Sequence, residues 1–581
     1  MNSARPTKPN LRSSEWFAGN DEVALSHRVV MASMGFNLEP DNDRPIIGIA
    51  DSSSELNPCN YPLRDHITDI KAGILAAGGI PMVFPVMSLG EDLMKPSAML
   101  YRNLLSMEVE EYLRSYPLDG VVLLANCDKS VPGALMGAAS SNLPTIMFTA
   151  GARPAAIYQG RRIGTGTDLW RMWADFRAGI ISEAEWRKFE RCLNCGLGSC
   201  NTMGTASSVA LMVEALGMML SGTSTIPAGD SARKVAAFDS GVEIVRLVNK
   251  QILPTDIMTP QAFRNAVRVL HACGGSTNAL IHLIAISGRV GGELSLGDIA
   301  KLGKNIPLLA DVEPSGKGLI QDFHEAGGLP ALAYELQHLL ELDAVTLTGK
   351  TLGECITPKK NSHVAIRSLD DPLQETGAFE VVSGNLAVNG AVIKISAASQ
   401  DLLKHTGPAV VFNSYSDMRE RIDDPELAVT KESVLVLTGC GAVGVPGMPE
   451  WGMIPIPKKL AAQGVVDMVR VTDARMSGTS FGTCILHVSP EGAIGGMIGL
   501  VRDGDLIELD VAQGNLNVQI SEAELEQRKS VATSTRNSHL RGWPALYQAH
   551  VLQPEEGCDF DFLRARTEEE RLFVPPIVGR S

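Results

Sequence analysis

Three cysteines of this chain lie in small polar settings that are far apart in the sequence. Cys59 stands in Asn-Pro-Cys-Asn, Cys127 in Asn-Cys-Asp-Lys-Ser and Cys200 in Ser-Cys-Asn-Thr. Thiolates are soft ligands that favour iron–sulfur clusters. Taken singly, a free cysteine is more often a buried structural thiol, but the polar neighbours of these three indicate metal binding. Only a fold can bring them together.

Asp128 and Lys129 follow Cys127 directly. Carboxylates are hard ligands that favour Mg²⁺, so this segment could serve a soft and a hard inorganic centre side by side. That pairing suits an enzyme that removes a hydroxyl group from one carbon while it holds the oxygens of the next. Burial lowers the basicity of a lysine, and a neutral Lys129 could take up carbon dioxide to become a carbamate, an anionic oxygen ligand. An ordinary surface ion pair is the alternative.

A second group of cysteines competes for Cys200. Cys192 and Cys195 precede it by a few residues, a spacing typical of a zinc or cluster loop. No further His or Cys nearby completes a closed zinc site. Spacing alone leaves open whether Cys195 or Cys59 is the partner of Cys200.

Two polar segments could add carboxylates or an anion site. Glu91 and Asp92 follow a predicted strand, where acidic residues are usually solvated. Ser276, Thr277 and Asn278 open a predicted helix. The free N–H groups at a helix start can bind a carboxylate or phosphate, and a plain N-cap is an equally good interpretation.

Two loops in the second half of the chain could also contribute. A glycine-rich loop ends in Glu450, and it lacks the Gly-Lys-Ser/Thr of a Walker motif. Ser477 lies in the polar loop 473–479, which is not the Gly-x-Ser-x-Gly elbow of hydrolases. A serine beside an arginine and near a metal could ionise.

The elements that must position these residues alternate along residues 45–149. Strands are predicted over 45–50, 80–86, 120–125 and 144–149, and helices over 64–77 and 98–115. This alternation is typical of parallel βαβ units. The polar segments 52–59, 87–92 and 126–130 follow the C-terminal ends of strands. Open α/β sheets bind ligands at that edge.

Beyond residue 149 the predicted elements are first mainly helices and then mainly strands. Helices are predicted over 182–191, 205–220, 279–286 and 319–340, the last with a break at 327–330. After about residue 370 short strands dominate, which favours a β-rich, barrel-like domain. The sequence thus predicts an α/β fold in three parts: an N-terminal arm over 1–44, a cluster- and metal-binding α/β domain over 45–370, and a β-barrel-like domain over 371–581 that carries Ser477.

Composition narrows the function further. The 581 residues are 45% hydrophobic and 20% charged, as in a globular protein. The net charge of −15 argues against nucleic acid or a membrane surface as partner. Ten cysteines are too sparse for a disulfide scaffold. No signal-peptide pattern and no apolar run of membrane-spanning length is found, so a cytoplasmic location is expected.

Together these segments make the chain resemble the dihydroxy-acid dehydratase and phosphogluconate dehydratase family of iron–sulfur hydro-lyases. The resemblance runs from about residue 45 to about 552. Its motifs are Asn57-Pro58-Cys59-Asn60, Cys127-Asp128-Lys129, Cys200 to Ala206, Gly274 to Asn278, Pro446 to Glu450 and Asp473 to Thr479. Much of the family has an Asp-Gly pair after the second strand, where this chain has Ser88 to Asp92. This departure resembles the sugar-acid branch of the family and implies a [2Fe–2S] cluster, with [4Fe–4S] as the alternative.

The resemblance implies a role for each candidate residue. Cys59, Cys127 and Cys200 would hold the cluster with one iron site open. Glu91, Asp128, Glu450 and a carbamylated Lys129 would hold Mg²⁺, with Glu91 preferred to Asp92. Ser477 would be the catalytic base, and Ser276, Thr277 and Asn278 would lie near the substrate. Cys192 and Cys195 would have no part in the cluster.

The expected reaction is dehydration of a sugar acid, such as a pentonate or hexonate, to a 2-keto-3-deoxy acid. The alternative within the family is the dihydroxy-acid dehydration of branched-chain amino-acid synthesis. An alternative of another class is an iron–sulfur electron-transfer protein, although such proteins normally ligate the cluster fully. A non-catalytic zinc scaffold is a third. The family leads us to expect a homodimer or homotetramer.

Overall fold

The N-terminal half is organised around a small parallel sheet. The computed structural model describes residues 10–358, 364–531, 540–565 and 575–578. Strands β1 (Ile46–Asp51), β2 (Ile80–Pro85), β3 (Gly120–Leu124) and β4 (Thr145–Phe148) form it in the order β2-β1-β3-β4, all parallel. The predicted βαβ pattern is therefore confirmed, because each strand lies within a residue or two of its expected bounds.

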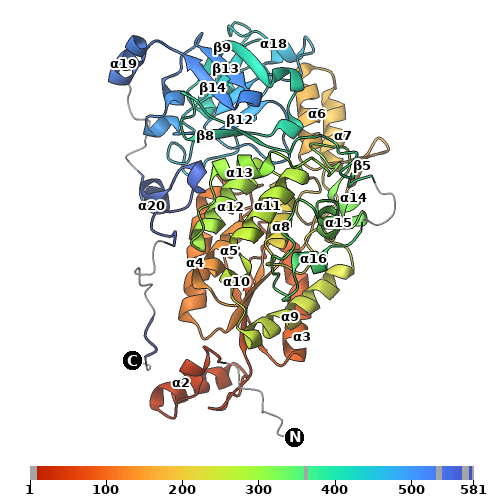
Figure 1. The fold of residues 1–581 in the computed structure, drawn as a ribbon, viewed down its shortest axis with the longest axis vertical. Coiled ribbons are helices and arrows are strands. Elements are labelled where there is room, and N and C mark those ends of the chain that lie inside the picture. The colour runs from red at the N-terminus through yellow and green to blue at the C-terminus, as the bar shows by residue number, and fades with distance from the viewer. Residues whose placement is uncertain (1–9, 359–363, 532–539, 566–574, 579–581) are drawn as a thin grey trace.

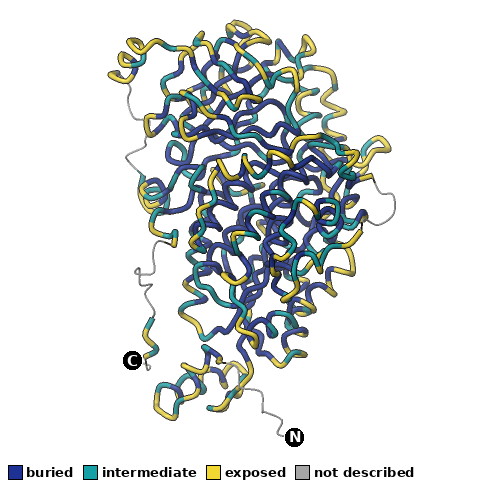
Figure 2. The backbone as a smooth tube through the Cα atoms, viewed as in Figure 1, coloured by how far each residue is buried: buried dark blue, intermediate teal, exposed yellow. Residues whose placement is uncertain are grey.

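Two pairs of helices cover this sheet. Helix α3 (Ile67–Ala76) packs on α9 (Ala232–Lys250), and α4 (Arg102–Ser115) packs on α5 (Ser130–Ser141). A further layer of α8 (Thr205–Ala215), α11 (Pro260–Ala272) and α12 (Thr277–Arg289) adjoins α5 and lies toward the C-terminal half (Figure 1). These elements share one large apolar core, and Figure 2 shows their backbone as mostly buried.

Eight strands form a second, mixed sheet in the C-terminal half. They are β7 (Glu380–Val382), β8 (Gly390–Ile393), β9 (Lys404–Phe412), β10 (Val434–Leu437), β11 (Arg470–Thr472), β12 (Cys484–Ser489), β13 (Leu506–Asp510) and β14 (Asn515–Gln519). Their order is β14-β13-β9-β10-β11-β12-β8-β7, with β9 to β12 parallel to one another and the outer pairs antiparallel.

This second sheet closes on itself almost completely. Ser383, just after β7, pairs with Asn515 at the start of β14, so the first and last strands meet. Alternate side chains fill the interior with a core of their own, which includes Val411, Val436 and Val471. The predicted barrel-like fold is confirmed in this region.

Several elements differ from the sequence prediction. Helix α8 ends at Ala215 rather than Leu220, because Gly217 turns the chain at a φ of +81° against the backbone of Thr346. Helix α2 (Glu22–Ser33) lies in the N-terminal arm, where no helix was predicted, at the lower end of the molecule in Figure 1, and its Met31 joins the main apolar core. The hairpin of β5 (Ala156–Tyr158) and β6 (Arg161–Ile163) was also missed.

The remaining helices agree with the prediction or were not addressed by it. Helix α7 (Glu183–Cys192) matches its expected bounds, and α14 (Ile320–Glu325) and α15 (Gly328–Glu335) are separated at the predicted glycine break. Helix α6 (Thr167–Ala178) follows the β5–β6 hairpin. None of the described helices is both long enough and apolar enough to span a membrane.

Candidate active site

The loops after β1, β2 and β3 meet at the C-terminal edge of the parallel sheet, and Asn60 connects them. Its Oδ1 accepts hydrogen bonds from the backbone N–H groups of Asn126 (3.0 Å) and Cys127 (2.8 Å). Its Nδ2 donates to the hydroxyls of Ser52 and Ser130, each at 3.0 Å. Asn60 is fully buried. The side chain therefore fixes Cys59 and Cys127 next to each other.

The loop that carries Cys200 lies against the Cys59 loop. Gly198 donates its N–H to the carbonyl of Pro58 at 3.0 Å. The buried Arg153 guanidinium donates to the carbonyl of Gly198 at 2.8 Å and approaches the sulfur of Cys59 at 3.8 Å. Arg153 thus holds together the two loops that carry Cys59 and Cys200.

The environment of the three thiols suits a metal cluster. A hydrogen bond with Cys59 and burial raise the pKa of Cys127, and burial raises the pKa of Cys200 to about 12. Neighbouring thiolates, two of them buried and that of Cys200 partly so, repel one another unless cationic metal offsets their charge. Their donor set fits an iron–sulfur cluster, which spreads its sulfur ligands more widely than a single ion does.

Cys192 and Cys195 are not part of this group. Cys195 is exposed, and its sulfur contacts the carbonyl of Pro154 at 3.3 Å. Cys192 is half-buried at the end of α7. The local cysteine spacing that competed with Cys59 in the sequence is therefore not assembled into a site.

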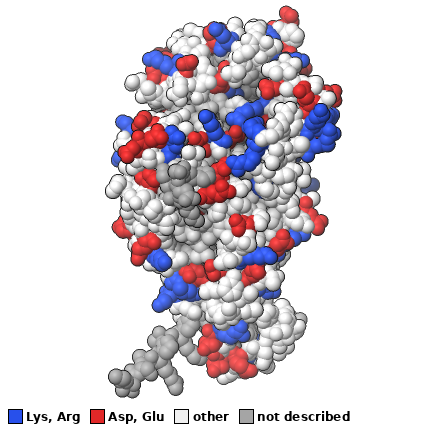
Figure 3. Space-filling view, turned by 90° about the vertical axis from the view of Figure 1, so that its right-hand side faces the viewer, with Lys and Arg blue, Asp and Glu red and all other residues white. Residues whose placement is uncertain are grey.

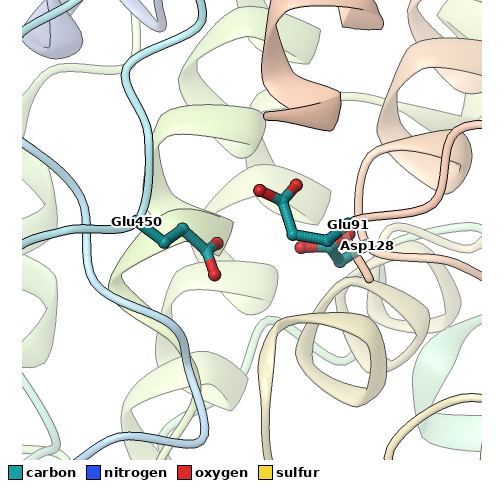
Figure 4. Close-up of side chains that lie close together, drawn as sticks. All are labelled: Glu91, Asp128 and Glu450. Carbon is teal, nitrogen blue, oxygen red and sulfur yellow. The ribbon is translucent and has the colours of Figure 1, made fainter. Parts of the chain in front are cut away.

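Three carboxylates form a second cluster beside the cysteines. In the described part of the chain, Glu91, Asp128 and Glu450 are the one set of three or more His, Cys, Asp or Glu residues whose ligand atoms lie within 4.8 Å of one another. Figure 4 shows the three carboxylates converging, with Glu450 entering from the barrel half of the chain. Asp92, the alternative to Glu91, is exposed. Carboxylate oxygens are the donors that Mg²⁺ prefers, so this set fits that ion.

Lys129 supplies positive charge to the carboxylate cluster. Its Nζ lies 2.9 Å from Glu450 and 3.5 Å from Glu91, and it also contacts Asp128. Burial and Arg475 lower the pKa of Lys129, but the three carboxylates outweigh them and raise it. Without a metal, therefore, Lys129 is an ammonium ion rather than the weakly basic amine that its burial alone predicts.

Arg475 is the second cation of the site. Its guanidinium donates to Glu450 at 2.8 Å and to the hydroxyl of Ser97 at 2.8 Å. Ser97 in turn donates to Glu91 at 2.9 Å. Burial raises the pKa of Glu450, but Lys129 and Arg475 outweigh burial and lower it to about 2. For Glu91 burial prevails, and its pKa is raised.

Asn278, in the first turn of α12, also reaches the carboxylates. Its Nδ2 donates to Glu450 at 2.9 Å and to the carbonyl of Met476 at 3.0 Å, while its buried Oδ1 has no hydrogen-bond partner among the described residues. Ser276 is the N-cap of α12, as its hydroxyl accepts from the N–H of Asn278. Thr277 is buried beside it. An unpartnered buried oxygen is the group that a bound ligand or ion can satisfy.

The loop that carries Ser477 comes from the barrel half and packs on the N-terminal half. A Cβ on Gly478 would lie 2.6 Å from the backbone nitrogen of Thr205 and 2.7 Å from the Cβ of Ser276. The loop can approach the starts of α8 and α12 this closely only because residue 478 is glycine. Ser477 is half-buried, and its hydroxyl lies 3.1 Å from that of Thr479.

Several residues of this site were not predicted from the sequence. Asn60 and Arg153 were missed, although Asn60 directly follows a candidate cysteine. Arg475 was noted only as a neighbour of Ser477, and its contact with Glu450 depends on two loops 25 residues apart. No spacing rule connects such residues, because their side chains meet only in the folded protein.

Comparison with known proteins identifies the class. The family model described as dihydroxy-acid/6-phosphogluconate dehydratase N-terminal matches residues 44–355, and the corresponding C-terminal model matches residues 364–558. The chain therefore belongs to the dihydroxy-acid/6-phosphogluconate dehydratase family, a family of hydro-lyases, as the sequence motifs implied.

Particular relatives match along nearly their whole length. The chain is 46% identical to an L-arabonate dehydratase of Azospirillum brasilense, covering 96% of this chain and 97% of that protein. It is 45% identical to a 6-deoxy-6-sulfo-D-gluconate dehydratase of Pseudomonas putida, covering 98% of each. It is 38% identical to a dihydroxy-acid dehydratase of Caldanaerobacter subterraneus subsp. tengcongensis, covering 92% of this chain and 97% of that protein.

Proposed function

We propose that this protein dehydrates a sugar acid, an aldonate such as a pentonate or hexonate, to a 2-keto-3-deoxy acid with the help of an iron–sulfur cluster and Mg²⁺. The observation that carries the proposal is the convergence of three cysteine loops, a carboxylate cluster and the Ser477 loop at one edge of the parallel sheet. The higher identity to the two relatives named for sugar acids than to the dihydroxy-acid dehydratase supports this substrate class.

Each half of the chain supplies part of the proposed centre. Cys59, Cys127 and Cys200 would hold a [2Fe–2S] cluster, with [4Fe–4S] as the alternative. Glu91, Asp128 and Glu450 would hold Mg²⁺. The ion would then balance the charge of these carboxylates in place of the Lys129 ammonium, and Lys129 would become a fourth oxygen ligand on carbamylation. The bound cluster and ion would supply Lewis acidity toward neighbouring oxygens of a 2,3-dihydroxy acid.

The protein's own residues would carry out the proton transfer. Ser477 would take the C2 proton on its Oγ, and the electrons of the C2–H bond would form a C2–C3 double bond as the C3–O bond breaks. The hydroxide that leaves and the proton that is taken amount to one water molecule. The enol product then becomes the 2-keto acid without net oxidation or reduction. Asn278, with its unpartnered oxygen, would orient the substrate together with Ser276 and Thr277.

The test is a panel of aldonic acids and 2,3-dihydroxyisovalerate, assayed for 2-keto acid release with protein purified without oxygen. Turnover of an aldonate at a kcat/KM well above that of dihydroxyisovalerate is the expected result. The opposite preference would assign the chain to branched-chain amino-acid synthesis. A cluster that cycles reversibly, with no dehydration of any acid, would favour electron transfer instead.

Ser477→Ala tests the base. Because the substitution removes only a hydroxyl, we expect iron content and fold to be unchanged and turnover to be abolished. Retained turnover would remove Ser477 from the mechanism.

Three further expectations stay predictions. The division of the chain at about residues 44 and 370 would be checked by limited proteolysis, and the dimer or tetramer by light scattering. The cytoplasmic location would be checked by fractionation of the producing cells.

A further inference from the structure

Lys394 is a buried lysine of the barrel half that reaches into the N-terminal half. It follows β8 directly, and only 2% of its surface is exposed. Its Nζ donates to the carbonyl of Gly274 at 2.8 Å. Gly274 lies in the loop between α11 and α12, four residues before Asn278. One hydrogen bond therefore ties the barrel sheet to the start of the helix that carries Asn278.

The charge of Lys394 is not balanced by a carboxylate of the described chain. Burial lowers the pKa of its amine to about 7, and the Cys273 thiol is the one described group that acts in the opposite direction. Burial in turn raises the pKa of Cys273 to about 12, so Cys273 is an uncharged thiol at neutral pH. Burying an amine without a counter-charge costs stability, and an apolar side chain of similar size avoids that cost. The hydrogen bond to Gly274 is therefore what favours a lysine at this position.

Helix α8 holds the same loop from the N-terminal half. The backbone N–H of Ser276 donates to the Ser208 hydroxyl at 2.9 Å, and the hydroxyls of Ser276 and Thr205 are 2.8 Å apart. Gly274 has a φ of +68°, a left-handed conformation that favours glycine. The turn into α12 is thus fixed by α8 on one side and by Lys394 on the other.

The contacts of Asn278 require the start of α12 to lie at a set distance from the barrel. Its Nδ2 donates to Glu450 at 2.9 Å and to the carbonyl of Met476 at 3.0 Å, and both acceptors belong to barrel loops. Those loops follow β10 and β11, which lie in the same sheet as β8. Lys394 therefore connects α12 to the same rigid sheet that presents the partners of Asn278.

We propose that Lys394 is a positioning residue for substrate binding, which holds the start of α12 where Asn278 can orient the sugar acid. This inference rests on the proposed function, in which Asn278 orients the substrate. Lys394 acts through the carbonyl of Gly274 and need not touch the substrate. The barrel half thereby controls a substrate contact that the N-terminal half supplies.

The test compares variants of the turn that follows β8, in protein purified without oxygen. Lys394→Met removes the amine and keeps the length of the side chain, whereas Lys394→Gln keeps an N–H donor. Ser396→Ala is the matched control, because the Ser396 hydroxyl forms a neighbouring hydrogen bond between the two halves, with Ser315 at 2.8 Å. That bond does not reach the carbonyl of Gly274.

Loss of the hydrogen bond should lower kcat/KM of Lys394→Met for an aldonate about 10- to 100-fold, since a shift of about 1 Å at an orienting group is enough for such a loss. Lys394→Gln should recover most of this loss, and Ser396→Ala should lose clearly less than Lys394→Met. Iron content should be the same in all three variants.

A double-mutant cycle with Asn278→Ala shows whether the effect passes through Asn278. Independent effects would multiply, whereas Lys394→Met should lower kcat/KM of the Asn278→Ala variant by no more than about twofold. Calorimetry gives a second measure that needs no turnover. Adding Lys394→Met to Ser477→Ala should raise the Kd for the aldonate about tenfold.

The inference is overturned by wild-type kcat/KM in Lys394→Met, by multiplying effects in the cycle, by an unchanged Kd, or by an equal loss in Ser396→Ala. Each of these results leaves the proposed function standing. If Lys394→Met does not fold, Lys394→Leu takes its place in the cycle. A wild-type protein that dehydrates dihydroxyisovalerate but no aldonate would overturn the proposed substrate class, and the cycle measured with that acid would still test Lys394.

Discussion

At the scale of single residues, Lys129 determines the charge balance of the site. Its ammonium is buried among Glu91, Asp128 and Glu450, and Arg475 adds a second positive charge. Removing a cation from buried carboxylates leaves their charge uncompensated. A substitution of Lys129 must therefore keep the positive charge if it is to separate the role of carbamylation from that of simple ion pairing.

Lys129→Arg makes that separation. The guanidinium keeps the charge but does not form a carbamate, so we expect Mg²⁺ content to fall and kcat to drop at least about 100-fold, with iron content unchanged. Metal analysis and turnover measure both effects. Labelled ¹³CO₂ should give a carbamate signal in the NMR spectrum of wild-type protein and none in the variant. Wild-type turnover by Lys129→Arg would exclude the carbamate.

Arg153 is expected to act on the cluster. Arg153→Gln removes the guanidinium that lies 3.8 Å from the Cys59 sulfur and donates to the carbonyl of Gly198. Positive charge and N–H groups near cluster sulfurs stabilise the reduced state, so the reduction potential should become more negative and iron content should fall. Spectroelectrochemical titration measures the potential. An unchanged potential and full iron content would show that Arg153 only holds together the loops that carry Cys59 and Cys200.

The sequence could identify a residue when its chemical type alone indicates its role, as a thiol or a carboxylate indicates a metal ligand. Asp128 follows this rule, whereas Glu91 and Glu450 were assigned only through the family resemblance, and the structure brings the three together. Asn60 and Arg153 escaped because an amide or a guanidinium acquires its role only from the atoms around it. The basicity of Lys129 was judged from burial alone, and three neighbouring carboxylates reverse that effect.

At the scale of elements, the site depends on how closely the Ser477 loop approaches α8 and α12. Gly478→Ala introduces a methyl group 2.6 Å from the backbone nitrogen of Thr205, which is closer than real atoms come. The loop must move, and overpacking of this kind costs about 1–3 kcal/mol. We expect turnover to fall at least about tenfold, because a shift of about 1 Å at a reacting group is enough for such a loss.

The control for Gly478→Ala is Gly229→Ala. Gly229 is exposed, and a Cβ there meets nothing within 4 Å. Thermal unfolding and turnover of the two variants should therefore differ clearly. Equal turnover of Gly478→Ala and wild-type protein would show that the contact does not position Ser477.

The strands were predictable because apolar β-branched runs between turn residues define them locally. The four parallel strands lie within a residue or two of their predicted bounds, and short strands dominate after residue 370 as predicted. The end of α8 was not predictable, since Gly217 stops the helix by packing against residues 345 and 346, far along the chain. Helix α2 was missed because the arm lacks the apolar periodicity of a buried helix, and several of its apolar side chains are exposed.

At the scale of the whole molecule, an overall charge of −15 must be reconciled with an acidic substrate. Figure 3 shows Lys and Arg side chains gathered, with acidic ones among them, on the upper part of the face that carries β5 and α6 in Figure 1. Arg161 and Arg171 belong to this hairpin and helix, and both guanidinium groups are partly exposed. Both arginines are paired with carboxylates, Arg161 with Asp168 and Arg171 with Asp168 and Glu313. Helix α6 also carries Trp170, which contacts Thr479, so this ion-pair group lies on an element that touches the Ser477 loop.

The stability of the whole chain should depend on pH through buried carboxylates in the barrel half. Burial raises the pKa of Asp473 to about 6 and that of Glu491 to about 7. Glu491 accepts hydrogen bonds from the N–H groups of Val443 and Gly444, in the loop that leads to Glu450. Buried histidines act in the opposite direction, since burial lowers the pKa of His271 to about 4 and of His487 to about 3. The net profile is thus a balance, and one group must be isolated from it.

Glu491→Gln isolates the carboxylate. In the unfolded chain Glu491 ionises near pH 4.5, whereas the folded protein retains its proton to about pH 7. The folded state therefore binds more protons between these values, and the stability contributed by Glu491 falls as pH rises through that range. The variant lacks this loss, so its free energy of unfolding relative to wild type should rise by about 2–3 kcal/mol between pH 5 and pH 8. Glu420→Gln, on the surface, should run parallel to wild type in the same urea titrations. A constant difference between Glu491→Gln and wild type across this pH range would mean that Glu491 is already ionised in the folded protein, with its charge stabilised by the loop N–H groups.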